Sequence, residues 1–526
     1  MATLVVFATQ VAFAAAPSAS PIVDTMTGRI AGEARNGIQV FRGIPFAAPP
    51  VGALRWALPQ PVATWTDVRD ATKFGPSCPI PAGLLQGSKG EAGSVHGAGY
   101  DVWIAKMEAG GSEDCLTLNV WSPARPQEKA PVMVFFSPTG SGSAPFFDGA
   151  AFARDGIVFV SPNNRTFTQS MFAHPALTAA AAPAKPPGRL HDWDRIAALE
   201  WVRDNAVAFG GDPNNITVFG ESNSAASILA LMTAPRAKGL FHKAIIQSGT
   251  SRGPWISREG TERIGTELAR IAGLDSGHAT LQQLQAIPLD ALPFFGAAVA
   301  DERLLPQSVE SAFAEGHTHR VALLVGGNTW DGSSLRYPSA TVLERTPPEV
   351  VKAYESEGLS GDALGYAIYT DEHVNAPARW YAEQHAATGA PVYHYIYSYV
   401  TSFRKQPLGA AHGEELPFVF DSWDKIPGAS KAINDEDRRV TKVMHDCWIA
   451  FARTGKPACQ GVPDWPTYVA ATGWTMELGR ESKLHQHYRK AQYAAQDRHK
   501  TLSPQTERGA DDVLEALRRA RTGESE

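Results

Sequence analysis

Hydrophobic residues along this chain gather in short continuous runs and do not alternate strictly with polar residues. A short continuous apolar run predicts a strand that is buried on both faces, as in a parallel sheet covered by helices. The runs of this kind lie at residues 132–136, 156–160, 216–219, 244–247, 322–325 and 392–397. They predict the strands of one large central sheet.

Segments with helical periodicity separate these runs. Ile196, Leu199 and Val202 recur three or four residues apart, which predicts an amphipathic helix over residues 194–209 that ends at two glycines. Residues 224–232 are also helical in composition. Strands that alternate with helices predict an α/β fold with a mostly parallel central sheet flanked by helices. The 38 prolines and 47 glycines indicate long loops around that sheet.

The first residues have the pattern of a signal peptide. An apolar run from Leu4 to Phe13 is followed by Ala14, Ala15 and Ala16, small residues that suit a signal-peptidase site. We therefore expect residues 1–16 to be cleaved and the protein to be secreted or periplasmic. No Lys or Arg precedes the run, so a disordered apolar terminus or a misplaced start codon are the alternatives.

Charge and cysteine content exclude several classes of protein. A net charge of -6 does not fit the basic surface of a nucleic-acid-binding protein. Beyond the N-terminal apolar run, no stretch of the sequence has the roughly 18 consecutive apolar residues of a membrane span. The 4 cysteines form neither a C-x-x-C pair nor a zinc-binding spacing, so we expect no metal site. They form either two disulfides, which suits export, or four separately buried thiols.

The segment from 216 to 226 carries the clearest chemical signal. A short strand ends at Gly220, Ser222 follows two residues later, and small residues then open a helix. This is the context of a nucleophile elbow, in which a tight strand-to-helix turn presents the serine near the positive end of the helix. Ser224 stands where the G-x-S-x-G pattern has its second glycine. The alternative interpretation is a surface serine that caps the helix.

Four segments together resemble the type-B carboxylesterases, the family that includes the cholinesterases and bile-salt-activated lipases. They lie at residues 42–52, 113–121, 209–213 and 220–222, and the similarity extends from Gly28 to Tyr468. The resemblance implies an α/β-hydrolase fold with long loop insertions over residues 21–485. It also implies a small-molecule ester substrate and no metal or organic cofactor. The tail at 486–526 is expected to be a peripheral helix or partly disordered, and the oligomeric state cannot be read from the sequence.

Catalysis by a serine needs a base and an acid that orients this base, in the chain order Ser, acid, His. The expected base is His412, because its segment resembles the family's catalytic histidine motif. The alternative is that His412 is only a hydrogen-bonded histidine of a loop. Asp331 follows the strand at 322–325, where the family usually has Glu, and is the expected acid, unless it is only an Asp-Gly turn residue. Glu415 is a weaker substitute for it.

The expected oxyanion hole departs from the family. Residues 137–142 read Ser-Pro-Thr-Gly-Ser-Gly where relatives have a histidine and a run of glycines. By register, the backbone N–H donors fall on Thr139, Gly140 and Asn223, and a shifted register would use Gly140 and Gly142 instead. The neighbouring segment 163–167 also differs from its family pattern, Asn-Tyr-Arg-Leu-Gly.

The resemblance also implies a Cys78–Cys115 disulfide, and Cys447 and Cys459 are close enough in sequence to form a second. We expect specificity to depend on the loops at 82–111 and 284–305. Trp330, Phe146 and Phe147 suggest an aromatic acyl pocket, unless they belong to the core.

Three hypotheses for function follow. An active carboxylic-ester hydrolase that forms an acyl-enzyme is the first, and the intact serine, acid and histidine favour it. A non-catalytic binding member of the same fold is the second, favoured by the altered 137–142 loop. An amidase or lactonase that uses the same triad is the third.

Overall fold

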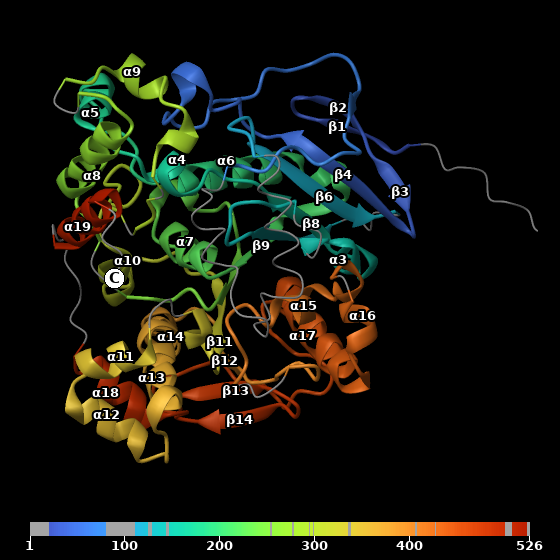
Figure 1. Ribbon diagram of the computed structural model, residues 1–526. Coiled ribbons are helices and arrows are strands. Elements are labelled where there is room, and N and C mark those ends of the chain that lie inside the picture. The colour runs from blue at the N-terminus through green and yellow to red at the C-terminus, as the bar shows by residue number, and fades with distance from the viewer. Residues whose placement is uncertain are drawn as a thin grey trace, which may run out of the picture.

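The computed structural model of the chain places two sheets and a surrounding set of helices (Figure 1). It describes residues 20–79, 111–124, 129–143, 147–252, 255–275, 278–293, 295–297, 299–334, 338–404, 408–426, 428–499 and 508–522. The expected signal peptide at 1–16, Phe146 and nearly all of the loop at 82–111 lie outside these residues.

A large sheet of 11 strands forms the centre of the molecule. Its strands are β3 (Glu33–Arg35), β4 (Ile38–Pro45), β6 (Thr117–Pro123), β7 (Ala130–Phe136), β8 (Val158–Pro162), β9 (Gly211–Glu221), β10 (Lys243–Gln247), β11 (Ala322–Asn328), β12 (Val392–Tyr397), β13 (Trp474–Leu478) and β14 (Lys483–Gln486). The spatial order is β14-β13-β12-β11-β10-β9-β7-β8-β6-β4-β3. Neighbours from β8 to β13 are parallel, and those at both edges are antiparallel. A small second sheet holds β1 (Ile22–Thr25), β2 (Gly28–Ala31) and β5 (Arg69–Asp70).

Both faces of the large sheet are buried, which explains the continuous apolar runs. In β7, Val132, Val134 and Phe136 join a core on one face, together with residues of the helices around the nucleophile. Met133 and Phe135 join a second core on the opposite face. Because successive strand residues point to opposite faces, a strand between two cores needs an apolar residue at every position.

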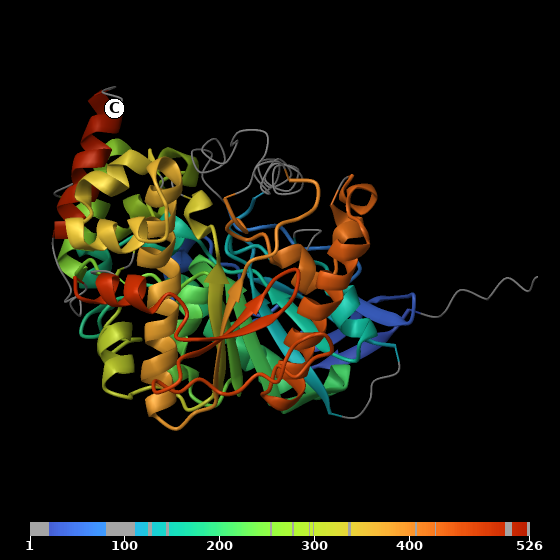
Figure 2. The same cartoon turned by 90° about the horizontal axis from the view of Figure 1, so that it is seen from below.

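Helices cover the two faces of this sheet (Figure 2). The first core contains residues of α6 (Leu190–Asn205), α7 (Asn223–Leu231), α10 (Val309–Ala314) and α14 (Ala376–Ala387), and the second contains residues of α3 (Ala150–Arg154), α15 (Leu416–Phe420), α16 (Ala429–Ala432) and α17 (Asp435–Thr454). The remaining α-helices of the described residues are α4 (Phe167–Met171), α5 (Pro175–Ala181), α8 (Arg258–Ile271), α9 (Leu281–Gln285), α11 (Ser339–Arg345), α12 (Pro348–Glu355), α13 (Gly361–Thr370), α18 (Lys490–Asp497) and α19 (Arg508–Thr522). The structure therefore confirms the expected parallel sheet with helices on both sides.

The C-terminal tail contributes two helices to the body of the molecule. α18 lies against α12, and α19 lies along α8, as both views show (Figures 1 and 2). Ala510 and Leu514 of α19 belong to a core cluster shared with α8. In its described part the tail is thus helical and packed.

Candidate active site

Ser222 occupies the turn between β9 and α7. Its backbone has φ 57° and ψ -126°, a conformation that L-residues rarely adopt and that is typical of a nucleophile elbow. The Ser222 N–H donates to the Gln247 carbonyl of the neighbouring strand at 2.9 Å. A side chain at Gly220 would place its Cβ 2.7 Å from Ser224 Oγ and 3.0 Å from the Phe136 carbonyl oxygen. Glycine is therefore required there for the turn to pack.

Ser224, the departure from the glycine pattern, is accommodated by hydrogen bonding. Its buried hydroxyl lies 2.6 Å from the Phe136 carbonyl oxygen and 2.8 Å from the Glu221 carbonyl oxygen. A buried hydroxyl without an acceptor would cost about 1–3 kcal/mol. Because acceptors are within reach, serine is compatible with the elbow and links it to the end of β7.

His412 and Asp331 meet Ser222 at the carboxyl ends of the strands. His412 Nε2 is 3.0 Å from Ser222 Oγ, and His412 Nδ1 is 2.7 Å from Asp331 Oδ1. The His412 loop is fixed to the Asp331 loop by two backbone contacts: the Trp330 N–H donates to the Ala410 carbonyl, and the His412 N–H donates to Ser333 Oγ. The structure thus brings the three residues predicted from the sequence together in the order that proton transfer requires.

The Asp331 carboxylate is fixed on its other oxygen as well. Oδ2 accepts hydrogen bonds from the Asn328 N–H at 2.6 Å and from the Ser248 hydroxyl at 3.0 Å. Asp331 is the first residue of η7 (Asp331–Ser334), which follows β11 after Thr329 and Trp330, and its side chain is buried. These contacts hold a carboxylate that is one methylene shorter than glutamate within reach of His412.

A second carboxylate lies beside the base. Glu221 is buried, and its Oε1 is 3.0 Å from His412 Nε2. Burial opposes the charged form of His412, but the carboxylates of Glu221 and Asp331 outweigh this and raise its pKa. Burial also opposes the charged form of Glu221, and this raises the pKa of its carboxyl group. The Glu221 carboxylate and the His412 imidazolium stabilise each other. When Glu221 is protonated, the imidazole loses one of the negative charges that favour its protonated form.

The 137–142 loop forms a compact turn with its own hydrogen bonds. The Gly140 N–H donates to the Ser137 carbonyl at 3.0 Å, and the Gly142 N–H donates to Asn163 Oδ1 at 2.8 Å. The Thr139 N–H has only a long contact of 3.4 Å with Ser137 Oγ. Both donors of the shifted register are therefore engaged in the resting structure. In the register expected from the sequence, the Gly140 N–H is also bound within the loop, and the Thr139 N–H has the weakest hydrogen bond.

Asn223, the third expected donor, is the first residue of α7. The N–H groups of the first helical turn have no partner within the helix, so this N–H points out of the helix end beside Ser222. The segment at 163–167 lies beside the loop, as expected: the Asn164 N–H donates to the Gly140 carbonyl. A buried ion pair, Arg165 with Asp194 at 2.7 Å, anchors that segment to α6.

Two of the aromatic residues expected in an acyl pocket, Phe147 and Trp330, lie within the described residues. Phe147 is fully buried and packs on Phe135 and Phe420, with ring centroids at 4.7 and 5.4 Å, so it is a core residue and the sequence-based expectation was wrong for it. Trp330 is partly buried, contacts Tyr366 edge-on and lies under the Arg404 guanidinium.

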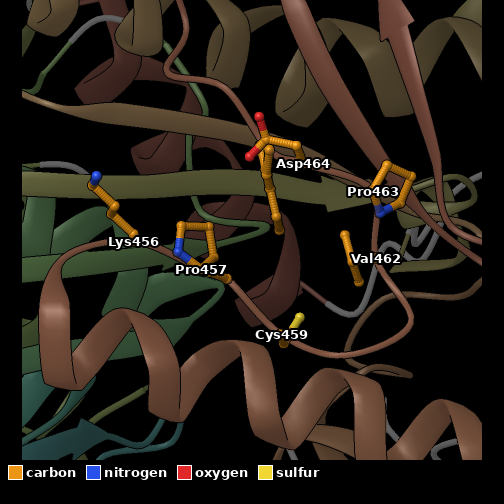
Figure 3. Close-up of a pocket in the computed structure, with 8 residues that line it drawn as sticks. Lys456, Pro457, Cys459, Val462, Pro463 and Asp464 are labelled. Carbon is orange, nitrogen blue, oxygen red and sulfur yellow. The ribbon is translucent and has the colours of Figure 1, made fainter.

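Disulfide bonds join Cys78 with Cys115 and Cys447 with Cys459. A hollow of about 250 Å³ lies beside the second bond, and Ser222, Asp331 and His412 are not among its lining residues. Figure 3 shows Lys456, Pro457, Cys459, Val462, Pro463 and Asp464 around it. Within the described ranges, no group of His, Cys, Asp and Glu side chains could hold a metal ion, and no helix is long and apolar enough to cross a membrane.

Several residues near the triad were not found from the sequence. Ser248, Gln247 and Asn328 lie at the ends of β10 and β11, and Glu221 precedes the nucleophile. Glu221 could have been suspected from its position beside Ser222. The others become relevant only when neighbouring strands bring them behind the triad.

The chain is similar to known proteins over most of its length. The model of the carboxylesterase family matches residues 19–357 and 362–496. The chain is 34% identical over 492 residues to the para-nitrobenzyl esterase of Bacillus subtilis strain 168, which covers 88% of this chain and 95% of that protein. It is 31% identical over 506 residues to the phenmedipham hydrolase of Pseudarthrobacter oxydans, with the same coverages of 88% and 95%.

Solved structures give the same result. A para-nitrobenzyl esterase structure superposes with a TM-score of 0.76 at 30% identity, covering 91% of this chain and 99% of that one. A carboxylesterase from Geobacillus stearothermophilus gives a TM-score of 0.75 at 31% identity, covering 90% and 99%. The chain therefore belongs to the carboxylesterase family: it has the α/β-hydrolase fold and is a carboxylic-ester hydrolase of the serine class.

Proposed function

We propose that Ser222 is the nucleophile, His412 the general base and Asp331 the orienting acid of this esterase. The observation that carries the proposal is the pair of contacts at His412, 3.0 Å to Ser222 Oγ and 2.7 Å to Asp331 Oδ1. Asp331 accepts a hydrogen bond from Nδ1–H, which keeps the proton on Nδ1 and leaves Nε2 unprotonated and directed at the serine hydroxyl.

The reaction proceeds by acyl transfer. Ser222 Oγ attacks the ester carbonyl while His412 Nε2 takes the hydroxyl proton, and the resulting imidazolium is stabilised by Asp331. The tetrahedral intermediate collapses as His412 returns the proton to the leaving alcohol, which gives an acyl-Ser222. Water, deprotonated by His412, then attacks the acyl carbonyl, and the carboxylic acid leaves as His412 returns the proton to Ser222 Oγ.

The Thr139 and Asn223 N–H groups are proposed as the principal oxyanion donors. Thr139 has the weakest internal partner in its loop, and Asn223 begins α7, whose positive end faces the nucleophile. Gly140 joins them when its N–H leaves the Ser137 carbonyl. This arrangement uses backbone groups only, so the altered side chains of the 137–142 loop are compatible with activity.

The name of the Bacillus subtilis relative makes a p-nitrobenzyl or p-nitrophenyl ester a reasonable first substrate. In the test, wild-type protein and Ser222→Ala are compared in turnover of p-nitrophenyl acetate and in labelling by a fluorophosphonate probe. We expect rapid labelling of the wild type, none of the variant, and a loss of turnover on the order of a millionfold. An unlabelled wild type would favour the non-catalytic hypothesis. Turnover of the variant within tenfold of wild type would exclude Ser222. Parallel assays with p-nitroanilides and lactones test the amidase and lactonase alternatives.

Export is proposed on two features. The apolar run at residues 4–13 and the alanines after it have the pattern of a signal peptide, and two disulfides suit an oxidising compartment. The N-terminal sequence of the mature protein, isolated from culture medium or periplasm, tests this: cleavage after about residue 16 is expected.

A further inference from the structure

A fully buried polar cluster lies directly behind the triad. Gln247 ends β10, Asn328 ends β11, Glu415 precedes α15, and Trp448 lies on α17; none of them has measurable solvent exposure. We call Gln247, Asn328 and Glu415 the amide–carboxyl cluster. It is not used in the reaction steps above, and buried polar groups of this kind are costly unless each has a partner.

Trp448 fixes the orientation of the Gln247 amide in this cluster. Its indole N–H can only donate, and it donates to Gln247 Oε1 at 3.1 Å. Gln247 must therefore present its NH₂ to Glu415 Oε1, at 2.9 Å. Glu415 Oε2 in turn accepts from Asn328 Nδ2 at 2.6 Å. Both Glu415 oxygens accept hydrogen bonds here, and these favour the carboxylate against burial, which raises the pKa of Glu415 to about 7.

Asn328 then connects the acid loop to the base loop. Its Nδ2 also donates to the Ala411 carbonyl at 2.6 Å, one residue before His412. Its backbone N–H donates to Asp331 Oδ2 at 2.6 Å. An amide flipped by 180° would place Oδ1 against a carbonyl and a carboxylate, so the Glu415 charge and the Ala411 carbonyl together select the observed orientation.

The cluster also reaches the nucleophile. The Ser222 N–H donates to the Gln247 carbonyl at 2.9 Å, so the residue that supports the elbow also holds Glu415. One connected set of buried hydrogen bonds thus joins the loops of Ser222, Asp331 and His412.

We propose that Asn328 is a positioning residue for the esterase reaction, which sets the distance between His412 and Asp331 through hydrogen bonds to the Ala411 carbonyl, the Asp331 carboxylate and the Glu415 carboxylate. The inference rests on the proposed triad. Asn328 touches no reacting atom and acts through the two loops, so its loss changes the alignment of the triad and leaves the substrate-binding surface in place. Misalignments of about 1 Å in an active site cost about a hundredfold in rate.

The first test compares Asn328→Ala with a matched control, Asn205→Ala. Asn205 is also a buried asparagine; it donates to the Trp201 carbonyl and accepts from the Met26 N–H, and neither partner belongs to the loops of the triad. On p-nitrophenyl acetate we expect Asn328→Ala to lose about tenfold to a hundredfold in kcat with KM within about twofold, and Asn205→Ala to keep kcat near wild type. Thermal unfolding of both variants measures the purely structural cost.

The second test exchanges the partners. Asn328→Asp removes both side-chain donors and sets a carboxylate against Glu415 and the Ala411 carbonyl, so at pH 8 it should lose more kcat than Asn328→Ala. Its kcat relative to wild type should rise as the pH falls, because a shared proton restores a donor between the two carboxyl groups. The double variant Asn328→Asp with Glu415→Gln restores one donor–acceptor pair, and we expect it to recover at least about tenfold of the kcat lost at pH 8.

These measurements separate the failure of this proposal from failure of the triad. A wild-type protein without turnover or fluorophosphonate labelling contradicts the proposed function. With an active wild type, the positioning role is overturned by any of three results: equal kcat losses in Asn328→Ala and Asn205→Ala, a loss confined to KM, or no recovery in the exchanged pair. The exchanged pair remains decisive if Asn328→Ala does not fold.

Discussion

Replacement of Asp331 by asparagine tests the orientation of His412 most directly, because it preserves the shape of the side chain and changes one oxygen to NH₂. Asp331 Oδ2 accepts from the Asn328 N–H at 2.6 Å and from Ser248 at 3.0 Å. The Asn328 N–H can only donate, so the amide oxygen must take this position. The amide NH₂ then faces His412 Nδ1, where the carboxylate oxygen stands at 2.7 Å in the wild type.

This reversal places the proton on the wrong imidazole nitrogen. A donor opposite Nδ1 favours the tautomer with the proton on Nε2, which is the nitrogen 3.0 Å from Ser222 Oγ. In that tautomer His412 cannot accept the serine proton. The equivalent change in a serine protease costs about 10⁴ in kcat, so we expect a fall of roughly 10³ to 10⁴, which corresponds to about 4 to 5.5 kcal/mol of transition-state stabilisation.

The assay is kcat and KM on p-nitrophenyl acetate between pH 7 and 9, with circular dichroism to confirm folding. Asp331→Glu is the matched control, because it keeps the charge and adds one methylene. The site is crowded: a Cβ built at Gly327 would lie 2.7 Å from Asp331 Oδ2. We expect it to be about 1–3 kcal/mol less stable and far more active than Asp331→Asn. Turnover of Asp331→Asn above about a tenth of the wild type would refute the reasoning and assign the acid role elsewhere.

Three further changes have defined outcomes. Glu221→Gln removes a carboxylate that raises the pKa of His412, so the imidazole should lose its proton at lower pH. The acid limb of the kcat/KM profile should therefore move down by about one to three pH units. An unchanged acid limb would contradict this and mean that Glu221 is already neutral in the active enzyme. Ser224→Ala removes the hydroxyl from the Phe136 and Glu221 carbonyls and should lower the free energy of unfolding by about 1–3 kcal/mol in urea titrations; an unchanged midpoint would contradict this. Replacement of both Cys78 and Cys115 by serine should cost about 4 kcal/mol, because the bond closes a loop with a sequence separation of 37; equal stability of the reduced and oxidised wild-type protein would argue against it.

The sheet could be predicted from the sequence because its signal is local. Burial of both faces demands apolar residues at each position, so β7, β8, β10, β11 and β12 were located to within a few residues. β9 was predicted only from residue 216, whereas it begins at Gly211, because its first half is polar and less buried. The elbow was predictable for the same reason: its glycine, serine and helix follow one another along the chain.

The environment of the triad could not be predicted, because it depends on contacts between residues far apart in sequence. The bond from Gln247 to Glu415 spans 168 residues, and that from Asn328 to Ala411 spans 83. Glu415, considered from sequence as a substitute acid, instead accepts hydrogen bonds from Gln247 and Asn328. Its position three residues after His412 indicated proximity to the base but not its partners.

The altered oxyanion loop is compatible with catalysis when the competing free energies are compared. In the resting structure the Gly140 N–H is engaged with the Ser137 carbonyl at 3.0 Å. The net value of such a neutral hydrogen bond is about 0.5–1.5 kcal/mol, whereas one oxyanion donor contributes about 2.7–4 kcal/mol to the transition state. Gly140 has φ 74°, and a glycine can rotate its peptide with little steric cost. If Gly140 is a donor as proposed, we therefore expect the transition state to outcompete the Ser137 carbonyl for its N–H, so that a loop that satisfies its own N–H groups at rest still provides an oxyanion hole.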